Sequence, residues 1–192
     1  MASKIKVDTL ETANGSGTIA LSNQLSGMTT ASLPTLTSAE MPSGSVLQIV
    51  NVQNGAIVTG TTTIDYDDGI PQNTEGDEYM TLAITPSNTN NLLKIEVTTM
   101  ASNSSVNHMI TLLFQDTTTS ALAAITAYQG VATGSVAVSF THYMTAGTTS
   151  ATTFKVRVGG EGAGTTSFNG QNTARRFGGT MASSITITEV AA

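Results

Sequence analysis

The chain has 192 residues, of which 7 are basic and 13 acidic, so its net charge is −6 and its isoelectric point about 4.6. This balance opposes binding to nucleic-acid backbones, which needs clustered Lys and Arg. The absence of cysteine excludes disulfides and thiol chemistry, and no apolar run approaches the roughly 18 residues of a membrane span, so we expect no membrane insertion. With 35 Thr, 19 Ser and 18 Gly, the composition predicts an all-β protein.

The first 27 residues contain two short apolar alternations, at residues 3–10 and 18–21, separated by the turn-forming sequence Asn14-Gly-Ser-Gly17. A hairpin of two strands is marginally stable by itself, so we expect this segment to be ordered by docking on another protein. The apolar side chains expected to make that attachment are Ile5, Val7, Leu10, Ile19 and Leu21. Residues 28–44 carry prolines and small hydroxyl residues, which favour an extended linker; a floppy terminus is the alternative.

From residue 45 to the C-terminus, short strands recur with Gly, Asn, Ser or Pro between them. The sequence predicts strands at residues 46–53, 56–65, 79–85, 92–102, 108–116, 123–128, 135–145, 151–158 and 184–190. Such spacing is typical of a β-sandwich or small barrel, and we predict an antiparallel, jelly-roll-like β-sandwich over residues 45–192.

Two of these runs, residues 46–52 and 108–114, are apolar on both faces. A strand buried on both faces needs a second covering layer, and a sandwich of this size offers one core. The pattern therefore predicts that another subunit covers these strands; the alternative is that the chain's own loops do so.

Six carboxylates lie within fourteen positions between Asp65 and Glu78. The residues considered for a calcium site are Asp65, Asp67, Asp68 and Asp77. The spacing is not that of an EF-hand loop, because Gly76 stands where its bidentate Glu is needed. A solvated acidic loop is the competing interpretation, and we expect no metal or other cofactor.

No catalytic motif is present. There is no GxSxG turn, and the two histidines, His108 and His142, have no metal-binding spacing. His142 is in phase with Phe140, which predicts an inward-facing position. The glycines of residues 159–164 match neither a P-loop nor GxGxxG before a helix, and they favour a closely packed connection. We expect the chain not to be an enzyme.

One patch near the C-terminus combines aromatic rings, side-chain amides and two arginines. Its candidate receptor-contacting residues are Phe168, Asn169, Gln171, Asn172, Arg175, Arg176 and Phe177. Aromatic rings supply apolar contact area and side-chain amides supply directional hydrogen bonds, and surfaces that bind sugars or proteins use both. The alternative is that Arg175 and Arg176 pair with the acidic loop.

Several segments resemble known proteins. They are residues 3–12 (SKIKVDTLET), 15–19 (GSGTI), 44–48 (GSVLQ), 84–94 (ITPSNTNNLLK) and 178–187 (GGTMASSITI). The first two are similar to the N-terminus of tail-fibre and related virion fibre proteins of marine tailed bacteriophages, including cyanophages, and the others to the C-terminal domains of those proteins. The resemblance implies a homotrimeric fibre of the virion, here in a short form.

In such a fibre, residues 1–27 would bind other virion proteins, and residues 45–192 would contact a host cell-surface glycan or protein. Residues 28–44 would link these two regions. The alternative function is that of a capsid-decorating, head-fibre or collar protein, which stabilises the particle and binds no receptor. A third possible function is that of a calcium-dependent carbohydrate-binding module of a cell. Residues 1–6 lack the apolar core of a secretory signal, so we expect synthesis in the bacterial host cytoplasm.

Overall fold

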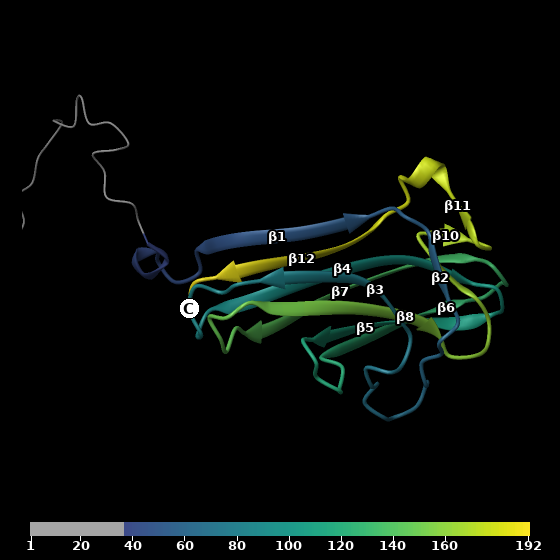
Figure 1. The fold of residues 1–192 in the computed structure, drawn as a ribbon, viewed down its shortest axis with the longest axis horizontal. Coiled ribbons are helices and arrows are strands. Elements are labelled where there is room, and N and C mark those ends of the chain that lie inside the picture. Colours follow the sequence, from purple (N-terminus) through teal and green to yellow (C-terminus); the bar gives the residue numbers. More distant parts are fainter. Residues whose placement is uncertain (1–36) are drawn as a thin grey trace, which may run out of the picture. The chain divides into compact units, whose positions relative to one another are not determined.

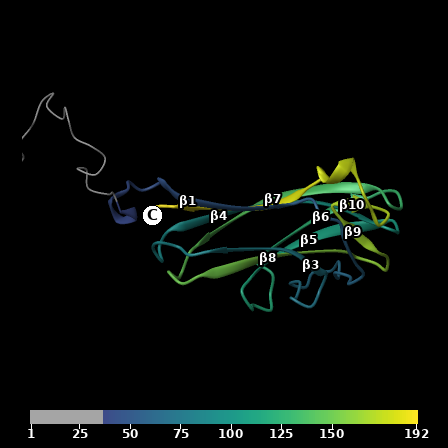
Figure 2. The same cartoon turned by 45° about the horizontal axis from the view of Figure 1, so that its top comes forward.

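The computed structural model describes residues 37–192, which form a two-layered antiparallel sandwich (Figures 1 and 2). Its strands are β1 (Val46–Asn54), β2 (Val58–Gly60), β3 (Asp77–Ile84), β4 (Leu92–Asn103), β5 (Asn107–Gln115), β6 (Ala123–Gln129), β7 (Ser135–Thr145), β8 (Thr152–Gly160), β9 (Thr166–Phe168), β10 (Gly170–Gln171), β11 (Ala174–Arg175) and β12 (Ser183–Val190). Within residues 37–192 the helical elements are two 3₁₀ turns, η2 (Ser38–Glu40) and η3 (Phe177–Gly179). No helix in this part of the chain is long and apolar enough to cross a membrane.

The strand order is that of a jelly roll. One sheet has the order β1-β12-β4, with β7 paired to the other edge of β4. Beyond the end of β12, the last residues of β4 pair with the short strand β9, which in turn pairs with β2. The second sheet has the order β3-β8-β5-β6. Counting the eight long strands in chain order, the sheets read 1-8-3-6 and 2-7-4-5, the double Greek key of a jelly roll. The predicted all-β, jelly-roll-like sandwich is confirmed.

The two sheets enclose one apolar core because alternate residues of each strand point inward. On β4, Leu93, Ile95 and Val97 are fully buried, whereas Lys94 and Glu96 face outward and form an ion pair of 2.9 Å. The same alternation buries Phe154, Val156 and Val158 on β8, and Ile185 and Ile187 on β12. Burying each such side chain contributes on the order of 1.5–3 kcal/mol, so this core is the main source of stability.

The two strands with apolar residues on both faces have different surroundings. On β5 the outward side chains Ile110, Leu112 and Phe114 are buried beneath Ile64 and Ala121, which come from the chain's own loops. The expectation that another subunit covers β5 is therefore wrong, since a loop already supplies its second layer. On β1 the outward Ile49 remains 61% exposed.

Two segments differ from the sequence prediction. The strand expected at residues 56–65 is confined to β2, because the chain then leaves the sheet so that Ile64 can cover β5. Residues 159–183, where no strand was predicted, contain β9, which pairs with both β2 and β4. The glycines of residues 159–164, at the end of β8 and just after it, are closely packed as expected: a Cβ at Gly159 would lie 2.7 Å from the backbone oxygen of Thr62.

The linker is described from residue 37 onward, and residues 1–36, with the expected attachment residues Ile5, Val7, Leu10, Ile19 and Leu21, lie outside the described part. At η2 the backbone N–H of Thr37 donates to Glu40 Oε2 at 2.6 Å, so residues 37–40 form a tight turn. It then pairs with the C-terminus: Gly44 N–H donates to the Ala191 carbonyl, and Ala191 N–H donates to the Ser45 carbonyl, both at 2.9 Å.

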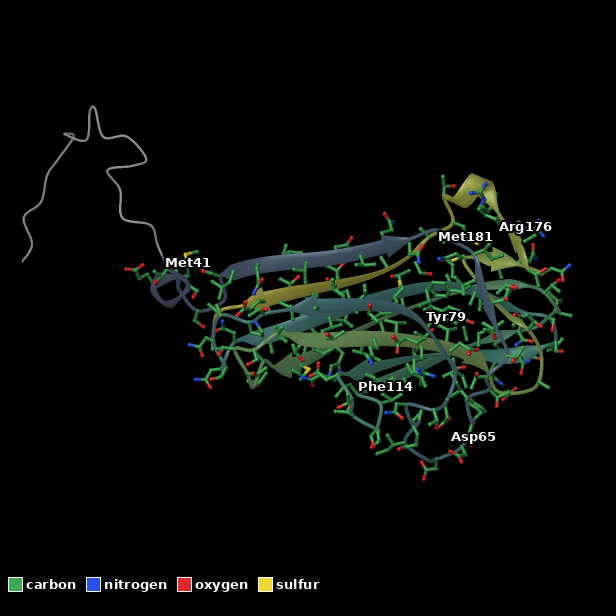
Figure 3. The ribbon with its side chains drawn as sticks, in the orientation of Figure 1. Met41, Asp65, Tyr79, Phe114, Arg176 and Met181 are labelled. Atoms are coloured by element: carbon green, nitrogen blue, oxygen red, sulfur yellow. The ribbon has the colours of Figure 1, made fainter. Side chains whose placement is uncertain are left out.

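The strands give the sandwich two ends. The entry end contains residues 37–45, the loops 85–91 and 146–151, and the C-terminus; the far end contains the connections 104–106, 130–134 and 161–182 and the first part of the connection 55–76. The later part of that connection, residues 71–73, pairs with the 116–122 loop along the outer face of β5. Figure 3 shows Met41 at the entry end and Arg176 at the far end.

A buried carboxylate connects the strands at the entry end. Glu189, on β12, is fully buried and accepts hydrogen bonds from Asn91 Nδ2 (2.6 Å), the Ser87 N–H and hydroxyl (2.8 Å each) and Gln48 Nε2 (2.5 Å). Burial alone would raise its pKa, but the hydrogen bonds from Asn91, Gln48 and Ser87 outweigh burial and hold the pKa of Glu189 below its ordinary value. This network fixes β1, β12 and the 85–91 loop where the linker enters.

Candidate functional site at the far end

The far end concentrates two features that mark contact surfaces. Four aromatic side chains of the described residues are more than half exposed, and three of them, Tyr66, Tyr128 and Phe177, lie there; the fourth, Tyr143, is on β7 near the entry end. Five of the six non-glycine residues with positive φ also belong to the far end: Thr133, Asn169, Asn172, Thr173 and Phe177. Residues in such strained backbone conformations cluster at active sites and ligand-binding sites in proteins.

One group of rings, the aromatic cluster, consists of Tyr66, His108 and Tyr128. The Tyr66 ring stacks on the His108 imidazole with centroids 4.5 Å apart and an angle of 13°, and the Tyr128 ring lies against the same imidazole at 4.9 Å and 46°. His108 Nδ1 is 2.9 Å from Glu161 Oε1, and this contact lowers the pKa of the Glu161 carboxyl. The imidazole is thus fixed, and both tyrosines remain open to solvent.

The sequence analysis missed this cluster. Tyr66 lies on the loop before β3, His108 at the start of β5, Tyr128 at the end of β6 and Glu161 just after β8. Spacing within a single segment cannot bring these four residues together; only the strand order does. His142, predicted to face inward, is half-buried on β7, and its burial lowers its pKa.

A hollow of about 180 Å³ lies beside the cluster, between the acidic loop and the outer face of β5 and β6. Its lining includes Asp65, Tyr66, Asp67, Ile110, Ala124 and Thr126. A second hollow, of about 260 Å³, lies on the outer face of β8 and contains Glu78, Lys155 and Arg157. Its two basic groups are already paired, since Glu78 Oε2 is 3.8 Å from Lys155 Nζ and 3.7 Å from Arg157 Nη1.

The acidic loop does not assemble the considered calcium site. Asp77 accepts hydrogen bonds from the Thr62 N–H (3.0 Å) and hydroxyl (2.8 Å), and Asp67 accepts one from the Gly69 N–H (2.7 Å). In the described part of the chain, no three His, Asp or Glu side chains are gathered as a metal site would require. Asp65, Asp67, Asp68 and Asp77 are therefore divided between holding the loop and facing solvent (Figure 3 shows Asp65 on this loop).

Two residues of the predicted receptor patch are buried. Phe168 is fully buried and stacks on Tyr79, with centroids 4.6 Å apart and an angle of 4°. Asn169 is also fully buried; its Nδ2 donates to the Asn54 and Ala56 carbonyls at 2.6 and 3.1 Å, and its Oδ1 accepts from the Ser183 hydroxyl at 2.6 Å. Both positions hold β9 in place, so neither side chain can contact a receptor in this fold.

The rest of the patch forms a small projection built from the β10–β11 hairpin and η3. Asn172, Arg175 and Phe177 are exposed, and Arg176 Nε donates to Gln171 Oε1 at 3.1 Å. Among the described residues no ion pair joins either arginine to the acidic loop. Phe177 is 77% exposed although its φ is 48°, a backbone conformation that a bulky side chain disfavours.

The chain matches no known family model and no curated protein sequence. It aligns with solved proteins of viruses at low identity. For infectious bursal disease virus Gx strain the identity is 14%, over 77% of this chain and 39% of that one, with a TM-score of 0.32; for the VP2 subviral particle of the same virus the values are 9%, 76%, 38% and 0.34. For the enzymatically active domain of bacteriophage CBA120 tailspike protein 4 they are 13%, 66%, 19% and 0.27.

The chain thus spans about two fifths or less of each of these solved chains. Likeness at this level determines neither the architecture nor the function. The assignment of the jelly roll rests on this chain's own strand order.

Proposed function

We propose that the chain is a bacteriophage virion protein, a short trimeric fibre that is attached to the particle through residues 1–27 and binds the host cell surface through the far end of its sandwich. The resemblance of its segments to virion fibre proteins supports the viral assignment. The observation that carries the receptor role is the gathering of Tyr66, Tyr128 and Phe177, all more than half exposed, at the end opposite the entry of the linker.

The sandwich suits this division of labour because its long strands run between the two ends. A ligand at the far end leaves the entry end free to be joined to a particle. Loops on a rigid sheet scaffold carry binding residues in many proteins. Three such domains in one fibre, and several fibres on one particle, would turn individually weak contacts into firm adsorption.

Self-association is the second part of the proposal. Near the entry end four large apolar side chains are exposed, Val46 (54%), Ile49 (61%), Leu92 (38%) and Tyr143 (56%). Strand β1 is also an edge of its sheet, and its sequence VLQIVNVQN contains neither proline nor charge, the usual protections of an edge strand. These features support a homotrimer that buries this surface.

The proposed role needs no catalysis and no cofactor. Thr, Ser and Asn give the surface hydrogen-bonding groups without a strong electrostatic field, which suits selective binding over indiscriminate adhesion. The protein would fold in the cytoplasm of the infected bacterium and be released in the virion.

Labelled full-length protein, incubated with cells of candidate marine bacteria, tests the receptor role. We expect it to bind the cells that the parent phage infects and to block adsorption of that phage. The matched variant Tyr66→Ala/Tyr128→Ala/Phe177→Ala should block less well, whereas Thr149→Ala, a change at an exposed position of the entry-end loop 146–151, should act like the wild type. Binding to every strain alike, or no competition by the wild-type protein, would contradict the proposal.

A protein that decorates the capsid or collar is the second candidate, because jelly rolls also build viral shells and the exposed surface near β1 would serve such an assembly equally well. Antibody labelling of particles in the electron microscope separates the two. Label on the tail supports the fibre; label over the shell, with particles that lose integrity without the protein, supports decoration.

A further inference from the structure

We infer that the hollow between the acidic loop and β6, together with the aromatic cluster, is a binding site for one neutral sugar residue of a cell-surface glycan. This inference rests on the proposed receptor role and specifies its ligand. We call this site, lined by Asp65, Tyr66, Asp67, Ile110, Ala124 and Thr126, the loop groove.

The floor and one wall of the loop groove are apolar. Ile110 and Ala124 form its base, and Tyr66, 58% exposed, stands beside them. Tyr128, 61% exposed, lies on the same outward face of β6 as Ala124 and Thr126 and continues the surface beyond the groove. Sugars present flat faces of C–H groups that pack on aromatic rings, so two open tyrosines along a shallow groove suit a sugar ring and its neighbour.

The rim supplies hydrogen-bond acceptors and carries negative charge. Asp67 uses Oδ1 to bind the Gly69 N–H, which leaves Oδ2 for a ligand, and Asp65 lies beside it. Carboxylates accept charge-assisted hydrogen bonds from sugar hydroxyls. No Lys or Arg lines the groove, and the same carboxylates repel sialic acids, uronic acids and sulfated sugars. The groove therefore favours neutral sugars.

The groove is held open by the protein itself. Beneath the acidic loop, Ile64 is fully buried and its N–H donates to the Gly160 carbonyl at 3.0 Å. The loop is closed by Glu75, whose carboxylate accepts from the N–H groups of Asp65 (2.9 Å) and Gln72 (2.6 Å). Arg157 donates to the Glu75 and Gly76 carbonyls at 2.7 Å each. The site is therefore already formed before a ligand binds, and little free energy is lost in ordering the loop.

An array of immobilised oligosaccharides tests the inference. The probes are neutral glycans ending in glucose, galactose, mannose or N-acetylhexosamines, their sialylated and sulfated counterparts, and a lysine-rich peptide. We expect the full chain to bind a subset of the neutral glycans only. Tyr66→Ala and Tyr128→Ala should each weaken binding to the best neutral glycan about tenfold, and Asp65→Asn by a smaller factor. Val131→Ala, which shortens an apolar side chain of similar exposure outside the loop groove, is the control.

Each outcome decides one of the two proposals. Binding only to anionic glycans or to the peptide, or equal binding by Tyr66→Ala, Tyr128→Ala and Val131→Ala, would overturn the sugar groove. If the tyrosine variants also block phage adsorption as strongly as the wild type does, the protein binds its receptor through another surface. If the wild type binds neutral glycans through the groove but does not compete with the phage, the groove is confirmed and the receptor role fails. Thermal unfolding checks that every variant is folded.

Discussion

The two ends of the sandwich are built differently. At the entry end short loops close on a fully buried carboxylate, Glu189, whose two oxygens accept four hydrogen bonds. At the far end two connections, residues 55–76 and 161–182, are long, five non-glycine residues have positive φ, and three aromatic rings face solvent. One end satisfies its polar groups internally, and the other keeps apolar rings and strained backbone at the surface. The contrast is what the proposed roles require, with the first end stabilising the sandwich and the second contacting a receptor.

The strongest test of this contrast compares two phenylalanines of the same segment. Phe168→Ala should lower the free energy of unfolding by about 3–5 kcal/mol, because it empties a fully buried site against Tyr79. Phe177→Ala should change it little, since this ring is 77% exposed. Denaturant unfolding measures both variants. A stable Phe168→Ala protein that has lost cell binding would show that the segment is a single contact surface, contrary to its division into buried and exposed parts.

The Glu189 network comes next in size. Glu189→Gln replaces a charged acceptor by an amide that meets the Asn91 and Gln48 amides, and we expect it to cost about 2–3 kcal/mol. The pKa of Glu189 is below its ordinary 4.5 in the folded state, so the unfolded chain binds the proton more readily. The stabilisation that the ionised Glu189 carboxylate provides is complete at pH values above 4.5, and it is lost as the pH falls through the lower pKa of the folded state. Thermal unfolding between about pH 6 and pH 3 should show this loss in the wild type and a flatter profile in Glu189→Gln.

The exposed surface near the entry end should control assembly. Ile49→Lys places a charge on the uncovered edge strand, and we expect it to weaken self-association at least tenfold, about 1.4 kcal/mol, without destabilising the single chain. Sedimentation at several concentrations measures the change. Ser135→Lys, at the far end of β7 in the same sheet, is the matched control. A wild-type protein that sediments as a monomer throughout would remove the trimer from the proposal.

Local alternation was sufficient to predict most of the fold. The run from Leu92 to Ser102 alternates so regularly that β4 could be placed almost to the residue, and the other seven long strands begin and end within two residues of their predicted bounds. Strand β9 was missed because three residues hold too little pattern; its partners on β2 and β4 are remote in sequence. The cover of β5 was assigned to the wrong source, because the sequence shows that Leu112 needs a partner but not that Ile64 provides it.

The candidate site was harder to predict than the fold. Grouping residues that are adjacent in sequence placed Phe168 beside Phe177, but β9 pairs with both β2 and β4, and Phe168 is buried there against Tyr79. Tyr66, His108 and Tyr128 meet only because a loop crosses the outer face of β5 and β6. Sites built from loops of several strands carry no local spacing to detect, whereas a strand carries its own period.

The smallest expected effect concerns the strained residue Phe177. With φ at 48°, Phe177 occupies a conformation that Asn tolerates better, so Phe177→Asn should raise the free energy of unfolding by about 0.5–1 kcal/mol. Phe177→Leu keeps an apolar side chain and the strain, and it should leave stability unchanged. If the ring is retained for contact, Phe177→Asn gains stability and loses cell binding, while Phe177→Leu loses less binding. A stabilised Phe177→Asn protein that binds cells as well as the wild type would mean that this ring has no role in contact, which would then rest on the aromatic cluster alone.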